Sequence, residues 1–197
     1  MSKGLFTKEK IIARSAELFN LYGYHRCSLQ DIMEATNLKK GGIYNHFRNK
    51  DEIAVAAFDY SSDLVFKRFR EKLAECTSAS EKLDAILRTF EENVENPIFK
   101  GGCPIINTAI DTTDTYPVLR EKAKAALNKL ETYISIKLSD GIKNGEFKKN
   151  IVAEEVAAFI VSSFEGAIIV SRLNSNNKYM KFTLVNIRNY IEREIKN

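Results

Sequence analysis

The chain has 197 residues, of which 44% are hydrophobic, with nine glycines, three prolines and no tryptophan. This composition excludes a collagenous or linker-dominated protein, and the length excludes a mini-domain that needs disulfides or a metal to fold. The net charge is +4, but residues 1–50 carry nine Lys or Arg and four Asp or Glu, a net of +5, whereas residues 51–197 have a net of −1. A positive field at one end suits a polyanion, although short basic segments are also common on solvated surfaces.

The cysteines and the apolar segments point to a reducing, aqueous compartment. Cys27, Cys76 and Cys103 are odd in number, widely spaced and form no CxxC pair, which argues against a secreted disulfide framework and a thiolate zinc site. Residues 1–23 are amphipathic and charged, unlike a signal peptide. The longest apolar stretch, Val156–Val170, contains Ser and Glu and is shorter than the roughly 20 residues that cross a bilayer. We therefore expect a cytoplasmic protein without a membrane segment, a metal or a cofactor.

Helical periodicity begins near the N-terminus. Apolar residues at spacings of three and four predict a first helix at about residues 7–22, which Gly23 ends. Ser28 and Asp31 form a capping-box pattern at the start of a second, short helix at about residues 28–36. These signals predict two helices joined by a short connection.

The helical pattern continues to the end of the chain. Asn37 tolerates a left-handed backbone and predicts a tight turn into a third helix at about residues 39–47. No strand alternation and no internal repeat is found, so the predicted fold is all-α with about nine helices. The remaining helices are expected near residues 49–76, 80–96, 105–110, 117–142, 152–173 and 178–195.

Two short helices joined by a tight turn and packed on an amphipathic helix are what a helix-turn-helix requires, because the second short helix must be free to enter a major groove. That helix contains Gly41 and Gly42, each of which costs about 1 kcal/mol relative to alanine in a helix interior. Close approach of the backbone to another surface is a use for the missing side chains, and Lys39 and Lys40 can meet phosphates or guanine edges. The alternative is a pair of solvated lysines beside a glycine loop, and composition alone does not separate the two.

A specific pattern runs through the first quarter of the chain. It comprises Ala16-Glu17-Leu18-Phe19, Gly23-Tyr24, Ser28 with Asp31-Ile32 and Ala35, and Ile43-Tyr44-Asn45-His46-Phe47 followed by Asn49-Lys50-Asp51-Glu52-Ile53. From Leu18 through Ile53 the chain resembles the DNA-binding segment of the TetR family of transcriptional regulators. The resemblance implies an N-terminal three-helix helix-turn-helix domain at residues 1–50 and a C-terminal helical effector-binding and dimerisation domain at residues 51–197.

In that family the third helix reads the major groove. The resemblance implies phosphate contacts by Tyr44, His46 and Lys50, and by Ser28 at the start of the second helix. Two positions depart from the family: Asn37 replaces a usual glycine, and Lys39 stands where a small capping residue is common, which leaves open whether Lys39 contacts bases or phosphates. The residues implied in DNA binding are Ser28, Lys39, Lys40, Gly41, Gly42, Tyr44, Asn45, His46 and Lys50.

By the same resemblance, the last two long helices form a homodimer. Apolar stripes on both helices agree with this, although packing within one chain would require the same periodicity. A two-fold dimer predicts a palindromic operator with half-sites about one helical turn or more apart. The expected interface contains Phe159, Ser163, Gly166, Ala167, Val170, Leu184, Ile187 and Ile191.

The expected effector site combines aromatic and apolar side chains with a few polar ones, which is the usual composition of a small-molecule pocket. The same aromatic residues are also common in an ordinary core. The composition fits a small, mostly hydrophobic effector. The candidate residues are Phe66, Phe69, Phe90, Phe99, Cys103, Ile106, Asn107, Tyr133, Phe164 and Glu165.

Cys103 lies in the run Gly101-Gly102-Cys103-Pro104. This run resembles a glycine-cysteine element at the same place in several TetR-family regulators, some of which sense electrophiles or oxidants. At a helix N-terminus the thiol pKa would fall and the reactive thiolate would be favoured, whereas the alternative is a buried structural cysteine. The predicted function is a repressor released from its operator by a hydrophobic effector or by modification of Cys103.

Two other functions compete with that of a regulator. An enzyme is not expected, because His25 and His46 have no HExxH-like spacing and no nucleotide-binding or GxSxG motif occurs. A nucleophilic Cys103 would also need a histidine base, and both histidines belong to the predicted DNA-binding segment. The alternative is a helical architectural protein that binds duplex DNA without sequence preference or effector control.

Overall fold

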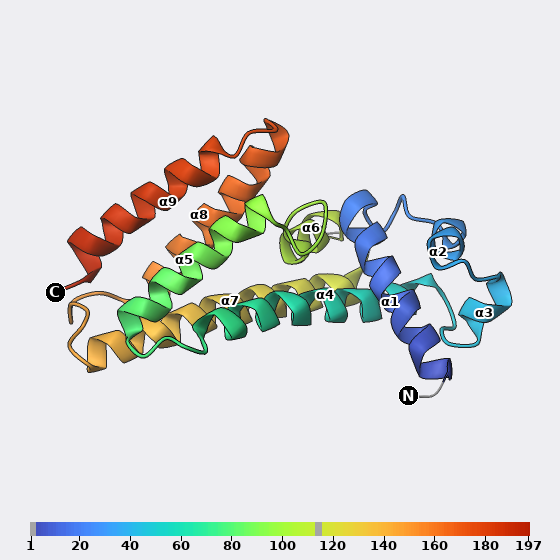
Figure 1. Ribbon diagram of the computed structural model, residues 1–197, viewed down its shortest axis with the longest axis horizontal. Coiled ribbons are helices and arrows are strands. Elements are labelled where there is room, and N and C mark those ends of the chain that lie inside the picture. Colours follow the sequence, from blue (N-terminus) through green and yellow to red (C-terminus); the bar gives the residue numbers. More distant parts are fainter. Residues whose placement is uncertain (1–2, 113–115) are drawn as a thin grey trace. The chain divides into compact units, whose positions relative to one another are not determined.

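The computed structural model describes residues 3–112 and 116–197 (Figure 1). Over these residues the chain forms nine α-helices and one turn of π-helix, and its β-bridge between Phe147 and Lys196 is isolated. The predicted all-α fold with about nine helices is confirmed. The elements are α1 (Lys3–Tyr22), α2 (Leu29–Thr36), α3 (Lys40–Tyr44), α4 (Lys50–Leu73), α5 (Ala79–Glu95), α6 (Pro104–Asp111), α7 (Pro117–Lys143), α8 (Ala153–Leu173), α9 (Lys178–Tyr190) and the π-turn η1 (Ile191–Ile195).

The ends of the first two helices follow from the predicted signals. Gly23 ends α1 with a φ of +82°. Ser28 caps α2 through the predicted capping box with Asp31, and Asn37 ends α2 in the left-handed conformation at a φ of 53°. The sequence signals for these turns are therefore confirmed.

Three predicted helix ends are wrong, and the first is the end of α4, which lies at Leu73 rather than near Cys76. The helix α1 begins at Lys3 rather than near Thr7, and Gly4 does not interrupt it. The helix α3 ends at Tyr44 rather than near Phe47. After Tyr44 the chain tightens into a turn, in which the His46 N–H donates to the carbonyl of Ile43 at 2.9 Å.

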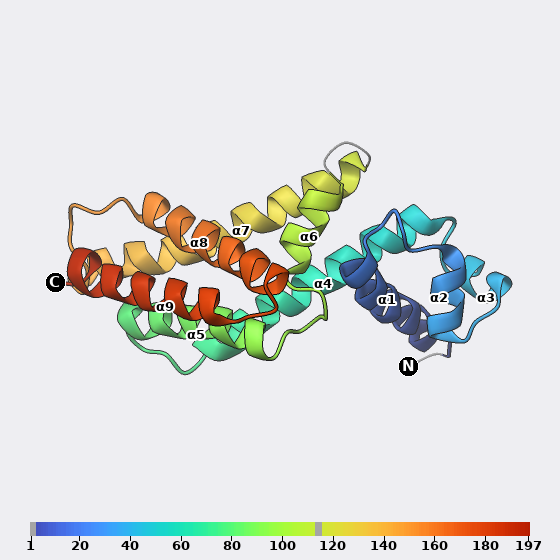
Figure 2. The same cartoon turned by 90° about the horizontal axis from the view of Figure 1, so that it is seen from above.

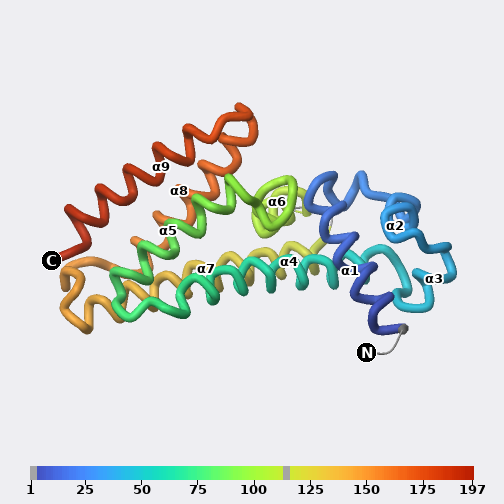
Figure 3. Tube along the Cα trace, viewed as in Figure 1, coloured from blue at the N-terminus to red at the C-terminus, as the bar shows by residue number. Residues whose placement is uncertain are grey.

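The described residues divide into two compact units, and Figure 3 traces the chain through each of them. Unit 1 contains the described parts of residues 1–65 and 99–126, and unit 2 contains residues 66–98 and 127–197. The helices α1, α2 and α3 therefore share a unit with α6, whereas α5, α8 and α9 belong to unit 2. The predicted domain boundary after residue 50 stays a prediction, since these units are defined by packing alone.

The core of unit 1 joins the inward sides of the first three helices. Ile11 and Phe19 of α1, Ile32 of α2 and Ile43 of α3 are each at most 3% exposed. Burying each such side chain stabilises the fold by roughly 1.5–3 kcal/mol. Phe47 is also buried directly after α3, so α3 is anchored on one side and open on the other.

In unit 2, α8 and α9 lie side by side, as Figures 1 and 2 both show. The 21-residue helix α8 is long and apolar enough to cross a membrane by length and composition, so the expectation that its apolar stretch is too short is wrong. The polar residues of Val156–Val170 do not interrupt α8, and the helix continues beyond both ends of this apolar stretch. Ten of its residues are buried, including Ile160 and Phe164 at 0% exposure, so its composition is that of a core helix.

The end of α7 packs so closely that it requires glycine. A Cβ at Gly141 would lie 2.2 Å from the ring of Phe147, which is fully buried, and 3.0 Å from Ala79. Beside it, the Glu146 carboxylate accepts hydrogen bonds from the N–H groups of Ala79 and Ser80 at 3.0 and 2.9 Å. These two donors lower the pKa of Glu146. The turn after α7 therefore fixes the beginning of α5.

Candidate functional site

The connection between α2 and α3 has the geometry of a helix-turn-helix. The Asp31 N–H donates to the Ser28 hydroxyl at 3.2 Å, and the Ser28 hydroxyl and N–H donate to the Asp31 carboxylate at 2.7 Å. The bonds from Ser28 lower the pKa of Asp31. The Leu38 N–H donates to the Met33 carbonyl at 3.1 Å, which closes α2 around Asn37. The Ser28 hydroxyl thus already stabilises the start of α2, and a phosphate would have to share it.

The predicted DNA-binding residues surround the open side of α3. Lys39 is the N-cap of α3 and makes no side-chain capping hydrogen bond, so its side chain does not serve the helix start. Ile43 is fully buried and holds the opposite side of the helix in the core. His46 is half-buried. The exposed predicted residues at α3 are Lys39, Lys40, Gly41, Tyr44 and Asn45.

Neither glycine of α3 is required by the packing of this chain. A Cβ at Gly41 would meet nothing within 4 Å, and a Cβ at Gly42 would meet only the side chain of Leu38 at an ordinary 3.7 Å. Neither residue has a positive φ. An alanine at either position would favour the helix by about 1 kcal/mol. The fold therefore leaves a short stretch of helix backbone accessible without a structural reason of its own.

Two lysines lie against aromatic rings beside this surface. Lys40 Nζ is 5.7 Å from the ring centre of Tyr44, and Lys8 Nζ of α1 is 5.5 Å from that of Phe47. Lys8 is exposed, so it adds a second element to the basic surface around α3. Lys8 was not predicted from the sequence, because its only signal was membership of the basic excess in residues 1–50.

Lys50 differs from the other predicted phosphate contacts. Its ammonium group donates to the Tyr24 carbonyl at 2.7 Å and to the Cys27 carbonyl at 3.0 Å. Both carbonyls belong to the connection between α1 and α2. Lys50 therefore stabilises this connection, whatever else it contacts.

Aromatic residues predicted for effector binding meet in unit 2. Phe90 stacks on Phe164 with ring centres 4.4 Å apart, and Phe69 packs edge-on to Phe90 at 5.3 Å and against Tyr133 at 6.5 Å. Burial raises the pKa of Tyr133. Phe66 of the same unit is 3% exposed and Glu165 is 5% exposed. Such close stacking describes a core as well as it describes the wall of a pocket.

The other predicted effector residues belong to unit 1, and they are Phe99, Cys103, Ile106 and Asn107. Cys103 is the half-buried N-cap of α6. The Asn107 carboxamide is engaged within the chain, because its Nδ2 donates to the Gly101 carbonyl at 2.7 Å and to Asn20 Oδ1 at 3.0 Å. Cys27 is not a candidate for a reactive thiolate. Burial raises the pKa of its thiol to about 11, so the thiol stays protonated at neutral pH.

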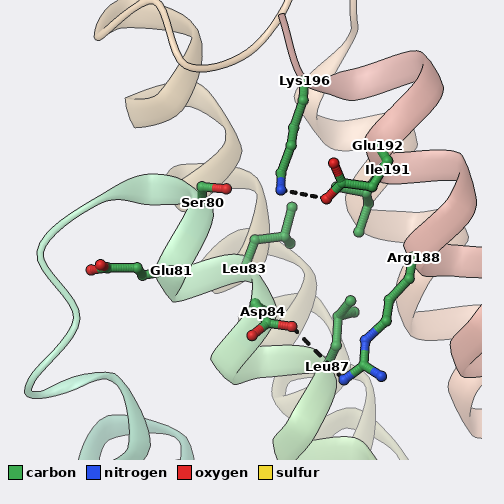
Figure 4. A pocket seen from close by; sticks show the side chains of 9 residues that line it. All are labelled: Ser80, Glu81, Leu83, Asp84, Leu87, Arg188, Ile191, Glu192 and Lys196. Atoms are coloured by element: carbon green, nitrogen blue, oxygen red, sulfur yellow. Dashed lines mark hydrogen bonds and ion pairs between the residues drawn. The ribbon is translucent and has the colours of Figure 1, made fainter.

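A groove of about 370 Å³ lies between α5 and the C-terminal helix, and none of the predicted effector residues lines it (Figure 4). Charged side chains at its rim interact with each other: Arg188 lies 3.8 Å from Asp84, and Lys196 pairs with Glu192. This groove was not predicted from the sequence, in which Ile191 was assigned to the dimer interface. Its lining consists of Ser80, Glu81, Leu83, Asp84, Leu87, Arg188, Ile191, Glu192 and Lys196. Within residues 3–112 and 116–197, no cluster of three or more His, Cys, Asp or Glu could hold a metal ion.

The predicted dimer residues fall into two groups. Leu184, Ile187 and Ile191 are at most 4% exposed and Ala167 is 6% exposed. These four side chains pack inside their own chain, which contradicts their assignment to the dimer interface. Periodicity identified the apolar side of α9, but that side faces the core of unit 2. Ser163 is half-buried. The exposed residues are Phe159, Gly166 and Val170 of the prediction, together with Ile169, Leu173, Phe182 and Val185, which the sequence analysis missed.

Comparison with known proteins identifies both ends of the chain. Residues 11–57 match the family model described as bacterial regulatory proteins, tetR family, and residues 79–186 match the tetracyclin repressor-like C-terminal domain. The crystal structure of a TetR transcriptional regulator from Chloroflexus aurantiacus J-10-FL is 37% identical, with a TM-score of 0.96 over 100% of this chain and 99% of that chain. A TetR-family regulator from Cytophaga hutchinsonii is 32% identical, with a TM-score of 0.89 over 98% and 96% of the two chains. The uncharacterized HTH-type transcriptional regulator YxaF of Bacillus subtilis (strain 168) is 26% identical over 86% of this chain and 87% of its own.

Proposed function

Because the chain belongs to the TetR family of transcriptional regulators, we propose that it is a repressor that binds a palindromic operator as a homodimer and is released by a small, mostly hydrophobic effector. The family consists of DNA-binding regulators, typically ligand-responsive repressors, and not of enzymes. The operator, the dimer and the effector of this particular chain are parts of the proposal. It further includes a cytoplasmic location, a DNA-binding region at residues 1–50 and an effector-binding and dimerisation region at residues 51–197.

The observation that carries DNA binding is the open glycine pair of α3. Gly41 and Gly42 cost helix stability without filling any need of the chain's own packing. A duplex groove is a surface that the backbone could approach closely only where Cβ atoms are absent. The exposed Lys39 and Lys40 at the same helix end supply the positive charge that such a surface attracts.

The proposed contacts divide into two kinds. Lys39, Lys40 and Asn45 lie where side chains reach base edges or phosphates at the start and end of a recognition helix. Tyr44 and His46 lie beside them and are assigned to phosphates, together with Ser28, Lys50 and the additional Lys8. Phosphate contacts of this kind fix the register of the helix on the duplex, while base contacts select the sequence.

The proposed homodimer uses the apolar surface that α8 and α9 leave exposed. Leu173 is 83% exposed, Phe182 59% and Val185 54%, which is unusual for three large apolar residues so close in sequence. Phe159 and Val170 extend the surface along α8. Pairing two copies of this surface about a two-fold axis would cover it and would place two recognition helices on a palindrome.

The proposed effector is apolar because the candidate residues of unit 2 are mostly rings. Phe69, Phe90 and Phe164 offer stacking surfaces, and Tyr133 and Glu165 offer polar groups. Effector binding shifts the protein from its operator if the effector has a higher affinity for the state that binds DNA poorly. Modification of Cys103 is proposed as a second route to release, supported by its place at the N-terminus of α6.

Selection of bound duplexes from a random-sequence pool tests this proposal, with purified, reduced protein at physiological salt. An enriched palindrome is the expected result. Salt-sensitive binding without an enriched motif would instead favour the architectural alternative, in which phosphate contacts act without base readout. With the operator in hand, release is tested by titrating apolar compounds and a thiol-alkylating reagent, with Cys103→Ser as the control for the reagent.

A further inference from the structure

The glycine-cysteine element before α6 is attached to the end of α1. The Asn20 side chain, in the last turn of α1, is 9% exposed, and its Nδ2 donates to the carbonyls of Lys100 and Gly102, each at 3.0 Å. From α6, Asn107 Nδ2 donates to Asn20 Oδ1 at 3.0 Å and to the Gly101 carbonyl at 2.7 Å. Two carboxamides therefore connect a loop and a helix that are about 80 residues away from α1 in sequence.

The glycines of this element are explained by the attachment to α1. Gly101 has a φ of +107°, and a Cβ there would lie 2.5 Å from the Asn20 carbonyl oxygen. Gly102 also has a positive φ, at +93°. The backbone of the loop can approach α1 this closely only without side chains at these positions. The loop is thus shaped to fit the end of α1.

A second set of bonds attaches α6 to the connection that leads into α2. The Tyr24 N–H donates to the Asp111 carboxylate at 2.6 Å, and the Tyr24 hydroxyl hydrogen-bonds the Thr108 hydroxyl at 3.1 Å. Burial raises the pKa of Tyr24 to about 12, so its phenol stays protonated. Gly23 is required here too, because its φ is +82° and a Cβ would lie 3.0 Å from Asp111 Oδ1. We name Asn20, Tyr24, Asn107, Thr108 and Asp111 the α6 joint.

The α6 joint acts on the segment directly before the helix-turn-helix. Tyr24 is followed within a few residues by Ser28, the N-cap of α2, and Lys50 holds the same segment through the Tyr24 and Cys27 carbonyls. The segment is therefore fixed by α6 on one side and by the start of α4 on the other. A displacement of α6 would change the position at which α2 begins, and with it the placement of α3.

We propose that the α6 joint positions α2 and α3 for operator binding, with Asn20 and Asn107 as positioning residues that do not contact DNA. This inference rests on the proposed function, since it requires an operator. If only the fraction of molecules with an intact joint binds the operator, the apparent Kd rises in inverse proportion to that fraction. Loss of the joint should therefore weaken binding without removing any phosphate contact.

The test uses the full chain and the selected operator duplex, with Asn20→Ala, Asn107→Ala and the double variant. Each single variant is expected to raise the operator Kd by roughly tenfold, as expected for a buried hydrogen bond. The slope of log Kd against log salt concentration should stay at the wild-type value, because no counterion-releasing contact is lost. Because both residues act in one joint, the effects of the two substitutions should not add. The operator Kd of the double variant should be no higher than that of the single variant with the higher Kd.

Asn93→Ala is the matched control, because Asn93 accepts a side-chain hydrogen bond from Arg68 in unit 2. It should leave the operator Kd unchanged. All Kd values are measured at a temperature at which circular dichroism shows every variant to be folded. If Asn20→Ala does not fold, Asn107→Ser is measured in its place as the second joint variant. Wild-type affinity of the folded joint variants would overturn the proposal, and so would a reduced salt slope, which would mean that charged side chains had lost phosphate contacts.

Hydrogen exchange separates this inference from the proposed function. Amides of α2 and α3 should exchange faster in both joint variants than in wild type or Asn93→Ala, while those of α8 and α9 should be unaffected. If the wild type selects no operator, the proposed function fails, and the joint is still tested by this exchange pattern. Unchanged exchange in α2 and α3 would overturn the positioning role.

Discussion

Gly41 of α3 and Gly141 of α7 both lie within helices, but their surroundings are opposite. A Cβ at Gly141 would lie 2.2 Å from a fully buried phenylalanine ring, whereas a Cβ at Gly41 would meet nothing within 4 Å. The chain's own packing explains the first glycine and leaves the second unexplained. Functional residues are therefore expected where the fold does not require the residue type.

The same distinction applies to apolar residues. Phe147 and Phe164 are fully buried, and the fold requires them. Phe182 is 59% exposed, so most of its apolar surface is not covered by its own chain. Changes of the first kind should lower stability, and changes of the second kind should alter binding to another molecule while the chain remains folded.

The largest effect is expected for Phe182→Glu, which would place a charge in the proposed dimer interface. Burying an unpaired carboxylate costs several kcal/mol, so the dimer should dissociate to monomers at micromolar concentration. Sedimentation velocity measures the mass. Phe6→Glu is the matched control, because Phe6 is also highly exposed, at 65%, but lies at the start of α1. A Phe182→Glu protein that remains dimeric would exclude this surface as the interface.

Gly141→Ala is expected to lower the free energy of unfolding by about 1–3 kcal/mol, because the added methyl group would lie 2.2 Å from the fully buried ring of Phe147. Urea denaturation followed by circular dichroism measures the change. In the matched substitution Gly41→Ala, the free energy of unfolding should stay the same or rise by up to about 1 kcal/mol. Equal stability of both variants would remove the contrast between the two glycines.

Lys40→Ala is expected to weaken operator binding and to reduce the salt slope by about one unit, because one lysine-phosphate contact would be lost. The measurement is operator Kd by fluorescence anisotropy at several salt concentrations. Lys149→Ala is the control, because Lys149 is an exposed lysine of unit 2. An unchanged slope with weakened binding would assign Lys40 to a base edge instead of a phosphate.

The smallest effect concerns the acid sensitivity of unit 2. The N–H groups of Ala79 and Ser80 lower the pKa of Glu146 in the folded protein. A lowered pKa contributes stability above the ordinary pKa of a glutamate, and this contribution is lost as the pH falls through the lowered value. Wild type should therefore be more stable than Glu146→Gln at neutral pH, and the two should converge in acid. Urea denaturation at both pH values checks this, and a constant difference would contradict it.

Local signals in the sequence predicted much of the fold. The Ser28 and Asp31 capping pair, Gly23 and Asn37 act through neighbouring backbone groups, so they can be recognised without knowledge of the tertiary structure. The start of α1 was missed because the helix continues through Gly4, a residue that ordinarily disfavours helices, and helix starts without a side-chain cap are weakly specified in sequence.

The functional residues were harder to predict where they depend on distant partners. The apolar stripe of Leu184 and Ile187 was visible in the sequence, but periodicity does not say whether the same chain or a second copy covers it. Asn107 was assigned to an effector, whereas its carboxamide bonds Asn20, a residue 87 positions earlier. Such pairings are set by tertiary packing and leave no local pattern.

The most direct measurement of the central claim is operator affinity of Gly41→Ala and Gly41→Val against wild type, together with their free energies of unfolding. Gly41→Ala is expected to be at least as stable as wild type, yet to bind the selected operator at least tenfold more weakly, with a larger loss for Gly41→Val. Such a result would mean that the missing side chain serves the duplex. Wild-type operator affinity in both folded variants would contradict the account, because the open backbone of α3 would then have no role in DNA binding.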